Sequence, residues 1–301
     1  MRGSDSILGL VVVVIWGLNF IAIKIGLHDI PPLLLGALRF LVATVPMIFF
    51  LPRPPVKWRW LISLGLAINL GQFAFLFLGM KLGMPAGLAS LVLQAQAFFT
   101  LIIAAKYLGE KWRWNNLAGL LLAFMGMAVV GFGQGGSMTV IGFWFTIAAA
   151  ASWGIGNIIL RRATQNVPPF SMLALTVWSG AVAILPLFFL SWCVEGTRAW
   201  QLAWENITLA GGGSILYLAY FATLGGYALW GKLLASYPAA TVSPFALLVP
   251  IVGLSSSHFL LGELLSIGQI IGSVLVMAGL SVNVFGNKLG QYLKSNLSNC
   301  G

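Results

Sequence analysis

Long apolar runs, separated by short polar turns, follow one another along the whole chain. Each run is about twenty residues long, the length that an α-helix needs to cross the hydrocarbon core of a membrane. Because that core offers no water to the backbone groups, these runs are predicted to be helices. The pattern therefore predicts an all-α polytopic membrane protein with about ten transmembrane helices. The predicted spans are 6–27, 31–51, 59–80, 85–107, 114–133, 139–160, 170–192, 207–230, 238–261 and 266–286.

The composition supports this fold class, since 59% of the 301 residues are hydrophobic and only 7% are charged. Of the 16 Lys and Arg, twelve fall in loops on the side of both termini, three on the other side, and Arg39 within a span. This bias predicts a multi-pass protein of the bacterial inner membrane with both termini in the cytoplasm. The basic residues are spread over membrane loops, so a nucleic-acid partner is not expected. The two cysteines have no metal-binding spacing, and no cofactor is expected.

One stretch between spans, residues 193–206, carries Trp200 and Trp204 four residues apart. This spacing places both rings on one face of a predicted interfacial helix.

Short motifs recur in order along the chain, which indicates an internal repeat. Trp153 follows Trp16 by 137 residues, and Pro168-Pro169 follows Pro31-Pro32 by the same offset. A second offset, 153 residues, links the later motifs of the two halves. We predict two inverted five-helix repeats, residues 1–137 and 138–287, around a central cavity, and a short cytoplasmic tail, 288–301. Inverted repeats are typical of transporters that work by alternating access. The motifs at the second offset are Pro85-Ala86 with Pro238-Ala239, Ser90 with Ser243, Gly109-Glu110 with Gly262-Glu263, Gly119 with Gly272, and Gly126 with Gly279.

Several stretches carry a family resemblance: WGLNFIAIKIGL near the start, PAGLASLVLQAQAFFT at 85–100, and SPFALLVPIVGL at 243–254, together with the two Gly-Glu pairs. They resemble the drug/metabolite transporter superfamily, and within it the EamA family and its exporters of cysteine and O-acetylserine in enteric bacteria. The resemblance implies a ten-helix basket that moves small metabolites outward. It does not fix the substrate of this protein.

Polar side chains within the first and sixth spans are candidates for substrate binding. Asn19 lies three residues from Trp16, and Asn157 lies four from Trp153, so each pair shares a helix face. Polar groups at membrane depth tend to face a cavity or a neighbouring helix. Both a substrate site and plain helix–helix hydrogen bonding fit this pattern.

The third and fourth spans add further candidates. Asn69 and Gln72 are predicted to share a helix face and to bind substrate. Gln94 and Gln96 lie two residues apart, so an α-helix would point them in nearly opposite directions, and only one would line a narrow pore. We select Gln94, which has Phe98 beside it at i+4.

Tyr220 and Tyr227 are predicted to line the same cavity from the eighth span, seven residues apart on one helix face. Arg39, the basic residue inside a span, is predicted to bind a substrate carboxylate in a two-pronged fashion. A side chain that instead snorkels to the membrane interface is the alternative role of Arg39.

No carboxylate is predicted at mid-membrane, because all six acids fall in loops or at helix ends. His258 and Glu263, near the end of the ninth span, are the candidates for proton coupling, and a facilitator without coupling fits as well. A purely structural His258 is the alternative. Pro244 and Pro250 interrupt the ninth span and are candidate gating residues or static kinks.

Two other functions compete with metabolite export. A drug or toxic-cation exporter would be expected to bury Asp or Glu within the membrane, and none is predicted there. An intramembrane enzyme would need a catalytic motif, and the sequence has neither HExxH nor GxSxG. The expected partners are a small-molecule substrate, the lipid bilayer and, if transport is coupled, protons.

Overall fold

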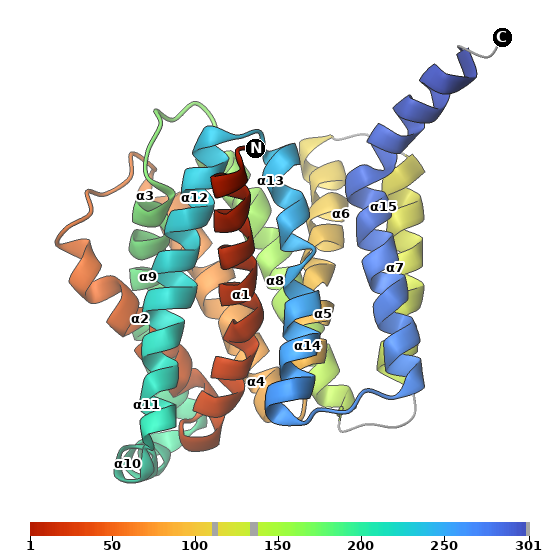
Figure 1. Ribbon diagram of the computed structural model, residues 1–301. Helices are drawn as coiled ribbons and strands as arrows, with labels where there is room; N and C mark the ends of the chain where they lie inside the picture. Colours follow the sequence, from red (N-terminus) through yellow and green to blue (C-terminus); the bar gives the residue numbers. More distant parts are fainter. Residues whose placement is uncertain (110–113, 133–137, 299–301) are drawn as a thin grey trace. The chain divides into compact units, whose positions relative to one another are not determined.

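The computed structural model describes residues 1–109, 114–132 and 138–298, without the side chains of residues 132, 239, 240 and 287–298. Within these ranges nine helices are long and apolar enough to cross a membrane, and a tenth apolar helix, Pro32–Ile48, is shorter. The predicted spans are thus confirmed as helices, although the last one continues beyond residue 286 (Figure 1). The segments in chain order are α1 (Gly3–Asp29), α2 (Pro32–Ile48), α3 (Trp58–Leu64), η1 (Gly65–Gln72), α4 (Phe73–Lys81), α5 (Ala86–Val92), η2 (Leu93–Ala95), α6 (Gln96–Leu108), α7 (Trp114–Phe132), α8 (Val140–Ala163), α9 (Met172–Val194), α10 (Gly196–Asn206), α11 (Leu209–Leu216), η3 (Tyr217–Gly225), α12 (Gly226–Ser236), α13 (Ala239–Ala246), α14 (Val249–Leu261) and α15 (Ile267–Ser298).

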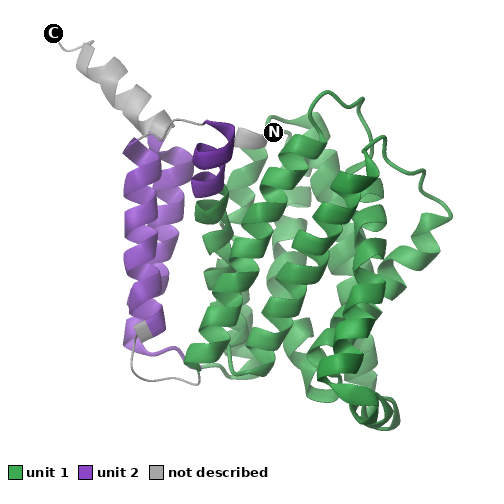
Figure 2. Cartoon of the chain, turned by 180° about the vertical axis from the view of Figure 1, so that it is seen from behind, with its two compact units in different colours: residues 1–100, 137–263 green, residues 101–136, 264–301 purple. Residues whose placement is uncertain are grey.

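The chain divides into two compact units, and each of them takes segments from both predicted repeats (Figure 2). Unit 1 comprises residues 1–100 and 137–263, and unit 2 comprises residues 101–136 and 264–301. Unit 2 is built on α7 and α15, whose backbones approach closely at glycines. A Cβ atom on Gly119 would lie only 2.6 Å from the carbonyl oxygen of Gly279. Small residues allow this contact, as is common between membrane helices.

Two π-helical segments, η1 and η3, interrupt the third and eighth spans of unit 1. They occupy equivalent places in the predicted repeats, because η1 shifted by 153 residues covers 218–225. In each segment a carbonyl accepts a side-chain hydrogen bond from a neighbouring helix. Ser152 Oγ donates to the Ala67 oxygen at 2.7 Å, and Trp16 Nε1 to the Ala222 oxygen at 3.1 Å. π-helical turns are frequent at functional sites, and the sequence did not predict them.

The fourth and ninth spans are also broken at equivalent places. The 3₁₀ turn η2 separates α5 from α6, and a break at Leu247 and Leu248 separates α13 from α14. Pro250 has no N–H to offer the carbonyl of Ala246, four residues earlier. The Gln94 side chain supplies the missing donor, with Nε2 at 3.0 Å from that oxygen. The prolines therefore produce the predicted interruption, and a gating role for Pro244 and Pro250 stays a prediction.

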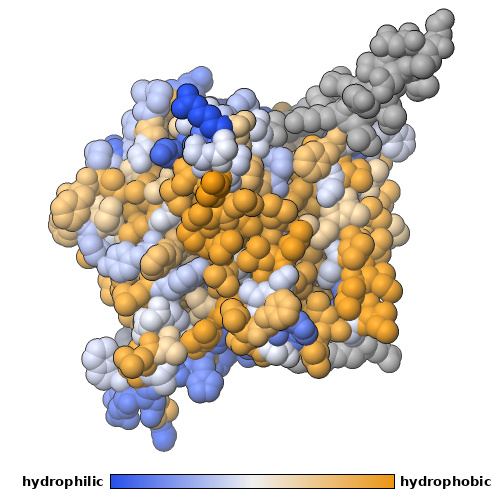
Figure 3. Space-filling model, in the orientation of Figure 1, coloured by the Kyte–Doolittle hydropathy of each residue, from blue (hydrophilic) through white to orange (hydrophobic). Residues whose placement is uncertain are grey.

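Apolar side chains cover the middle of the face of unit 1 that Figure 3 shows, and polar residues gather at its ends. The helix predicted within 193–206 is confirmed as α10, at the end of unit 1 opposite the N-terminus (Figure 1). Trp200 links α10 to α9 by a hydrogen bond, in which its Nε1 donates to Ser191 Oγ at 2.8 Å. Broad apolar middles with polar ends are what a lipid bilayer requires of a helical protein.

Candidate functional site

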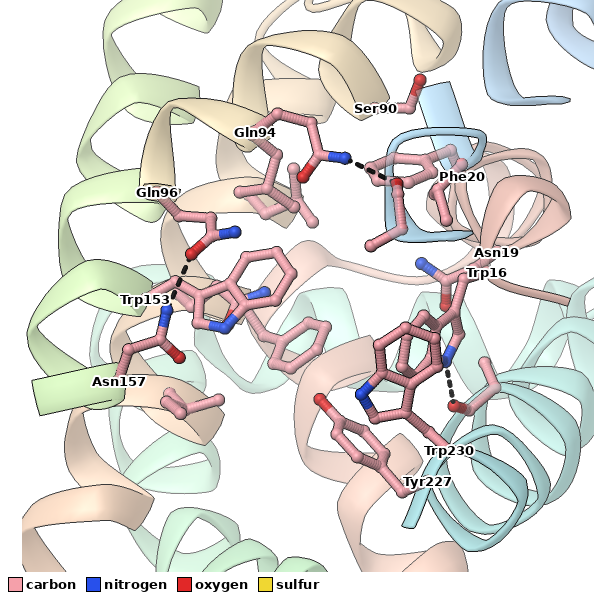
Figure 4. Close-up of a pocket in the computed structure, with 18 of the residues that line it drawn as sticks. Trp16, Asn19, Phe20, Ser90, Gln94, Gln96, Trp153, Asn157, Tyr227 and Trp230 are labelled. Atoms are coloured by element: carbon pink, nitrogen blue, oxygen red, sulfur yellow. Dashed lines mark hydrogen bonds between the residues drawn. The ribbon is translucent and has the colours of Figure 1, made fainter. Parts of the chain in front are cut away.

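Unit 1 contains a cavity of about 410 Å³, lined by helices of both predicted repeats. Its volume lies within the roughly 300–1,000 Å³ that is usual for small-molecule sites. Figure 4 shows the side chains that surround it, with Asn157, Trp153 and Gln96 on one side and Asn19, Trp16, Tyr227 and Trp230 on the other. The predicted substrate residues that line the cavity are Trp16, Asn19, Arg39, Gln72, Gln94, Trp153, Asn157 and Tyr227.

Asn69 and Tyr220 do not line this cavity, so their predicted place in it is wrong. Asn69 is buried and donates from Nδ2 to Ser179 Oγ at 3.0 Å, whereas the Tyr220 side chain is 44% exposed. Both predictions assumed the period of an α-helix. The π-helical turns of η1 and η3 change that period, so residues three or seven apart no longer share a face.

Gln96 lines the cavity together with Gln94, which corrects the prediction that only one of them would do so. The physical reason is the 3₁₀ turn of η2, which contains Gln94 and ends just before Gln96. Residues i and i+2 are separated by about 120° around the axis of a 3₁₀-helix, whereas they are separated by about 160° in an α-helix. The tighter turn brings both amides to the same cavity.

Arg39 is a buried cation on α2, with only 3% of its surface exposed. Its Nε donates to Thr223 Oγ1 at 3.0 Å, and its Cζ lies 4.1 Å from the ring centre of Phe73. No described Asp or Glu lines the cavity, and Arg39 forms no ion pair with a described residue. The guanidinium is therefore held by a hydroxyl and an aromatic face but has no counter-ion there. The burial of Arg39 also means that its side chain does not extend to the protein surface, as the snorkelling alternative would require.

Three buried polar atoms at the cavity have no hydrogen-bond partner among the described residues: Asn19 Oδ1, Gln72 Oε1 and Arg39 Nη1. An unsatisfied buried polar group costs about 1–3 kcal/mol, and more when it is charged. Such groups call for an explanation, and a polar ligand is one. An anionic group is the complement of the Arg39 nitrogen, and hydrogen-bond donors are the complements of the two amide oxygens.

A cluster of aromatic rings forms one wall of the cavity. The ring centre of Trp16 lies 5.5 Å from that of Tyr227 and 5.2 Å from that of Trp230. Trp230 was not among the predicted residues, although it follows Tyr227 by three residues, a spacing that shares a helix face. Aromatic faces of this kind attract ammonium groups.

His258 and Glu263 lie at the end of α14 and do not line the cavity. His258 is exposed, and its Nδ1 is 3.0 Å from the backbone oxygen of Glu263. The Glu263 carboxylate accepts hydrogen bonds from the N–H groups of Ala86 and Gly87, at 2.8 and 3.0 Å. These two N–H groups open α5 and would otherwise lack acceptors. The Glu263 carboxylate thus links the end of α14 to the start of α5 through these hydrogen bonds. Its role in proton coupling stays a prediction.

Comparison with known proteins adds to this geometry. The EamA-like transporter family matches residues 4–132 and again residues 140–285. A protein of Salmonella typhimurium named "Probable amino-acid metabolite efflux pump" is 48% identical over 95% of this chain and 96% of its own length. A protein of Escherichia coli with the same name is 44% identical over the same shares of both chains. One crystal structure, 19% identical, covers 94% of this chain and 99% of its own with a TM-score of 0.54, which shows a similar fold.

Proposed function

This chain belongs to the EamA-like transporter family, and on that premise we propose that it exports small amino-acid metabolites, such as cysteine and O-acetylserine, by alternating access. The names of the relatives from Salmonella typhimurium and Escherichia coli support amino-acid metabolites as the substrate class. We place the protein in the bacterial inner membrane with both termini in the cytoplasm, as the distribution of basic residues predicts.

The observation that carries the proposal is the buried guanidinium of Arg39, which lacks a counter-ion among the described residues. A substrate carboxylate would supply that charge through a charge-assisted hydrogen bond to Nη1. The oxygens of Asn19 and Gln72 would accept hydrogen bonds from the substrate ammonium group. A zwitterionic amino acid therefore satisfies groups that the protein leaves unpaired. A cationic drug does not, because the cavity lining contains no carboxylate.

The test is counterflow of labelled cysteine and O-acetylserine in liposomes that contain the purified protein. We expect flux well above that of empty vesicles. Arg39→Gln should lower it by about 10- to 150-fold, since hydrogen bonds to charged groups contribute roughly 1.5–3 kcal/mol. Arg53→Gln is the matched control, because Arg53 packs on Trp58 outside the cavity. Unchanged flux in Arg39→Gln would overturn the carboxylate role, and absence of amino-acid flux in the wild type would overturn the substrate class.

The same vesicles distinguish coupled transport from facilitation. Substrate that is concentrated under an imposed pH gradient indicates proton coupling, and His258→Ala and Glu263→Gln then test the two candidate groups. Substrate that only equilibrates across the membrane indicates a facilitator, which agrees with a cavity lining that contains no titratable carboxylate.

A further inference from the structure

We infer that Gln96 selects the substrate's side chain, through an amide NH₂ group that Asn157 and Thr100 hold towards the cavity. The substrates it favours are amino acids whose side chain carries a neutral hydrogen-bond acceptor, such as an ester or amide carbonyl. This inference rests on the proposed function, because it concerns the same cavity. Gln96 is the residue that contacts the substrate, and Asn157 and Thr100 are the residues that orient its amide.

Thr100 fixes the direction of the hydrogen bonds in this group. Its hydroxyl donates its single proton to the backbone oxygen of Gln96 at 2.7 Å. The remaining lone pairs of Oγ1 can only accept. The side-chain atom of Asn157 at 3.0 Å from Oγ1 is therefore the donor nitrogen, Nδ2.

The orientation of Asn157 in turn fixes that of Gln96. The same Nδ2 lies 2.7 Å from the side-chain oxygen of Gln96 and gives it a second proton. Turning both amides over would place the Asn157 oxygen against the lone pairs of Thr100. The Gln96 amide therefore faces Asn157 with its oxygen, and its NH₂ group is directed away from Asn157, towards the cavity (Figure 4).

The NH₂ group of Gln96 is available to a ligand. Gln96 is half-buried, lines the cavity, and its Nε2 has no acceptor among the described residues. Trp153 stands on the same side of the cavity (Figure 4), and no described residue accepts a hydrogen bond from its indole N–H. Asn19 lies on the opposite side of the cavity (Figure 4), and its oxygen has no partner among the described residues.

The two walls suit the two ends of one substrate. With the carboxylate at Arg39 and the ammonium group near Asn19, the side chain reaches the wall of Gln96 and Trp153. A carbonyl oxygen there accepts from the Gln96 NH₂ group. An aliphatic side chain of the same shape leaves that donor unpaired, and sites built to hydrogen-bond a ligand discriminate strongly against such analogues.

The experiment compares two ligands of the same shape: O-acetyl-L-serine, and L-homoleucine, which has carbon at both side-chain oxygen positions. Dissociation constants come from tryptophan fluorescence of the purified full-length protein, so they do not depend on transport. We expect the wild type to bind O-acetylserine about 10-fold more tightly than homoleucine. Gln96→Met, which keeps the length and removes the donor, should abolish this preference. Should Gln96→Met fail to fold, Gln96→Glu replaces the donor by an acceptor and should likewise lose it.

Variants of Thr100 and Asn157 test whether these residues orient the Gln96 amide. Thr100→Val and Asn157→Ala should each reduce the preference several-fold, and Thr100→Ser, which keeps the hydroxyl, should restore it. Asn157→Ala should have no further effect in a Gln96→Met background. Thr146→Val is the matched control, because Thr146 makes the same hydroxyl-to-carbonyl bond, to Gly142, and neither residue lines the cavity.

Equal affinities of the wild type for the two ligands, or a preference that survives in both Gln96 variants, would overturn the inference. Counterflow of cysteine in the same preparation would then leave the proposed function standing. Binding of neither ligand together with absence of amino-acid flux would overturn both.

Discussion

The two copies of the Trp–Asn motif, one in each predicted repeat, line the same cavity but differ in their hydrogen bonds. On α1, Trp16 donates to the Ala222 carbonyl, while the oxygen of Asn19 has no partner among the described residues. On α8 the situation is reversed. Asn157 donates two hydrogen bonds, and no described residue accepts from the Trp153 indole. The same motif thus leaves an amide unpaired in one repeat and an indole N–H unpaired in the other.

The packing around the two motifs, in contrast, is equivalent. A Cβ atom on Gly17 would lie 2.5 Å from Val252, and one on Gly154 would lie 2.6 Å from Phe99. These pairs are related by the two sequence offsets, 137 for the glycines and 153 for their neighbours. The comparison shows equivalent close contacts of the backbone in the two predicted repeats, together with different hydrogen bonds.

The polar difference comes from the neighbouring helix. Asn157 bonds to Gln96 and Thr100. The positions 153 residues later hold Val249 and Gly253, which offer no side-chain acceptor. Asn19 therefore finds no equivalent acceptors for its NH₂ group, and its oxygen also has no partner among the described residues.

The largest effect should come from filling the equivalent glycine contacts. Gly17→Val and Gly154→Val should each lower the free energy of unfolding by about 2–3 kcal/mol, because the added methyl groups overlap with the facing helix. Thermal unfolding in detergent measures this, with Gly212→Val as the control, since that glycine has open space around it. Clearly unequal losses would contradict equivalent packing.

Replacing the two tryptophans by phenylalanine should lower the free energy of unfolding by less, and by unequal amounts. Trp16→Phe leaves the buried Ala222 carbonyl without its donor and should lower the free energy of unfolding by about 1–2 kcal/mol. Trp153→Phe loses no hydrogen bond and should stay within about 0.5 kcal/mol of the wild type. The exposed Trp204→Phe is the control. Equal losses at Trp16 and Trp153 would show that the indole hydrogen bond does not distinguish the two motifs.

Replacing the two asparagines by leucine should change the free energy of unfolding the least, and in opposite directions. Asn157→Leu loses two hydrogen bonds and should lower the free energy of unfolding by about 1 kcal/mol, since such bonds average roughly 0.6 kcal/mol within membranes. Asn19→Leu removes an unpaired buried oxygen and should be neutral or stabilising by up to about 1 kcal/mol. The measurement is chemical unfolding in mixed micelles, with Asn206→Leu at the exposed end of α10 as the control. A destabilised Asn19→Leu would mean that its oxygen is already paired.

Local sequence patterns were sufficient wherever the helix kept the regular α period. The α-helical neighbourhoods of Trp16, Arg39 and Asn157 are regular, and these residues line the cavity as predicted. The predictions were wrong for Asn69, Gln96 and Tyr220, each in or directly beside a π or 3₁₀ segment. A non-α turn changes the phase of every residue that follows it, and no residue type in those segments marks the change in advance.

The sequence by itself determined the class of protein, the approximate limits of the membrane-spanning helices and the repeated motifs, because these depend on run length, composition and spacing. Only the tertiary structure decided which polar atoms are paired, as the partners of Arg39, Asn157 and Trp16 lie tens to hundreds of residues away. Hydrogen-bond direction and the absence of a counter-ion at a buried guanidinium are properties of such distant contacts, and local periodicity carries no information about them.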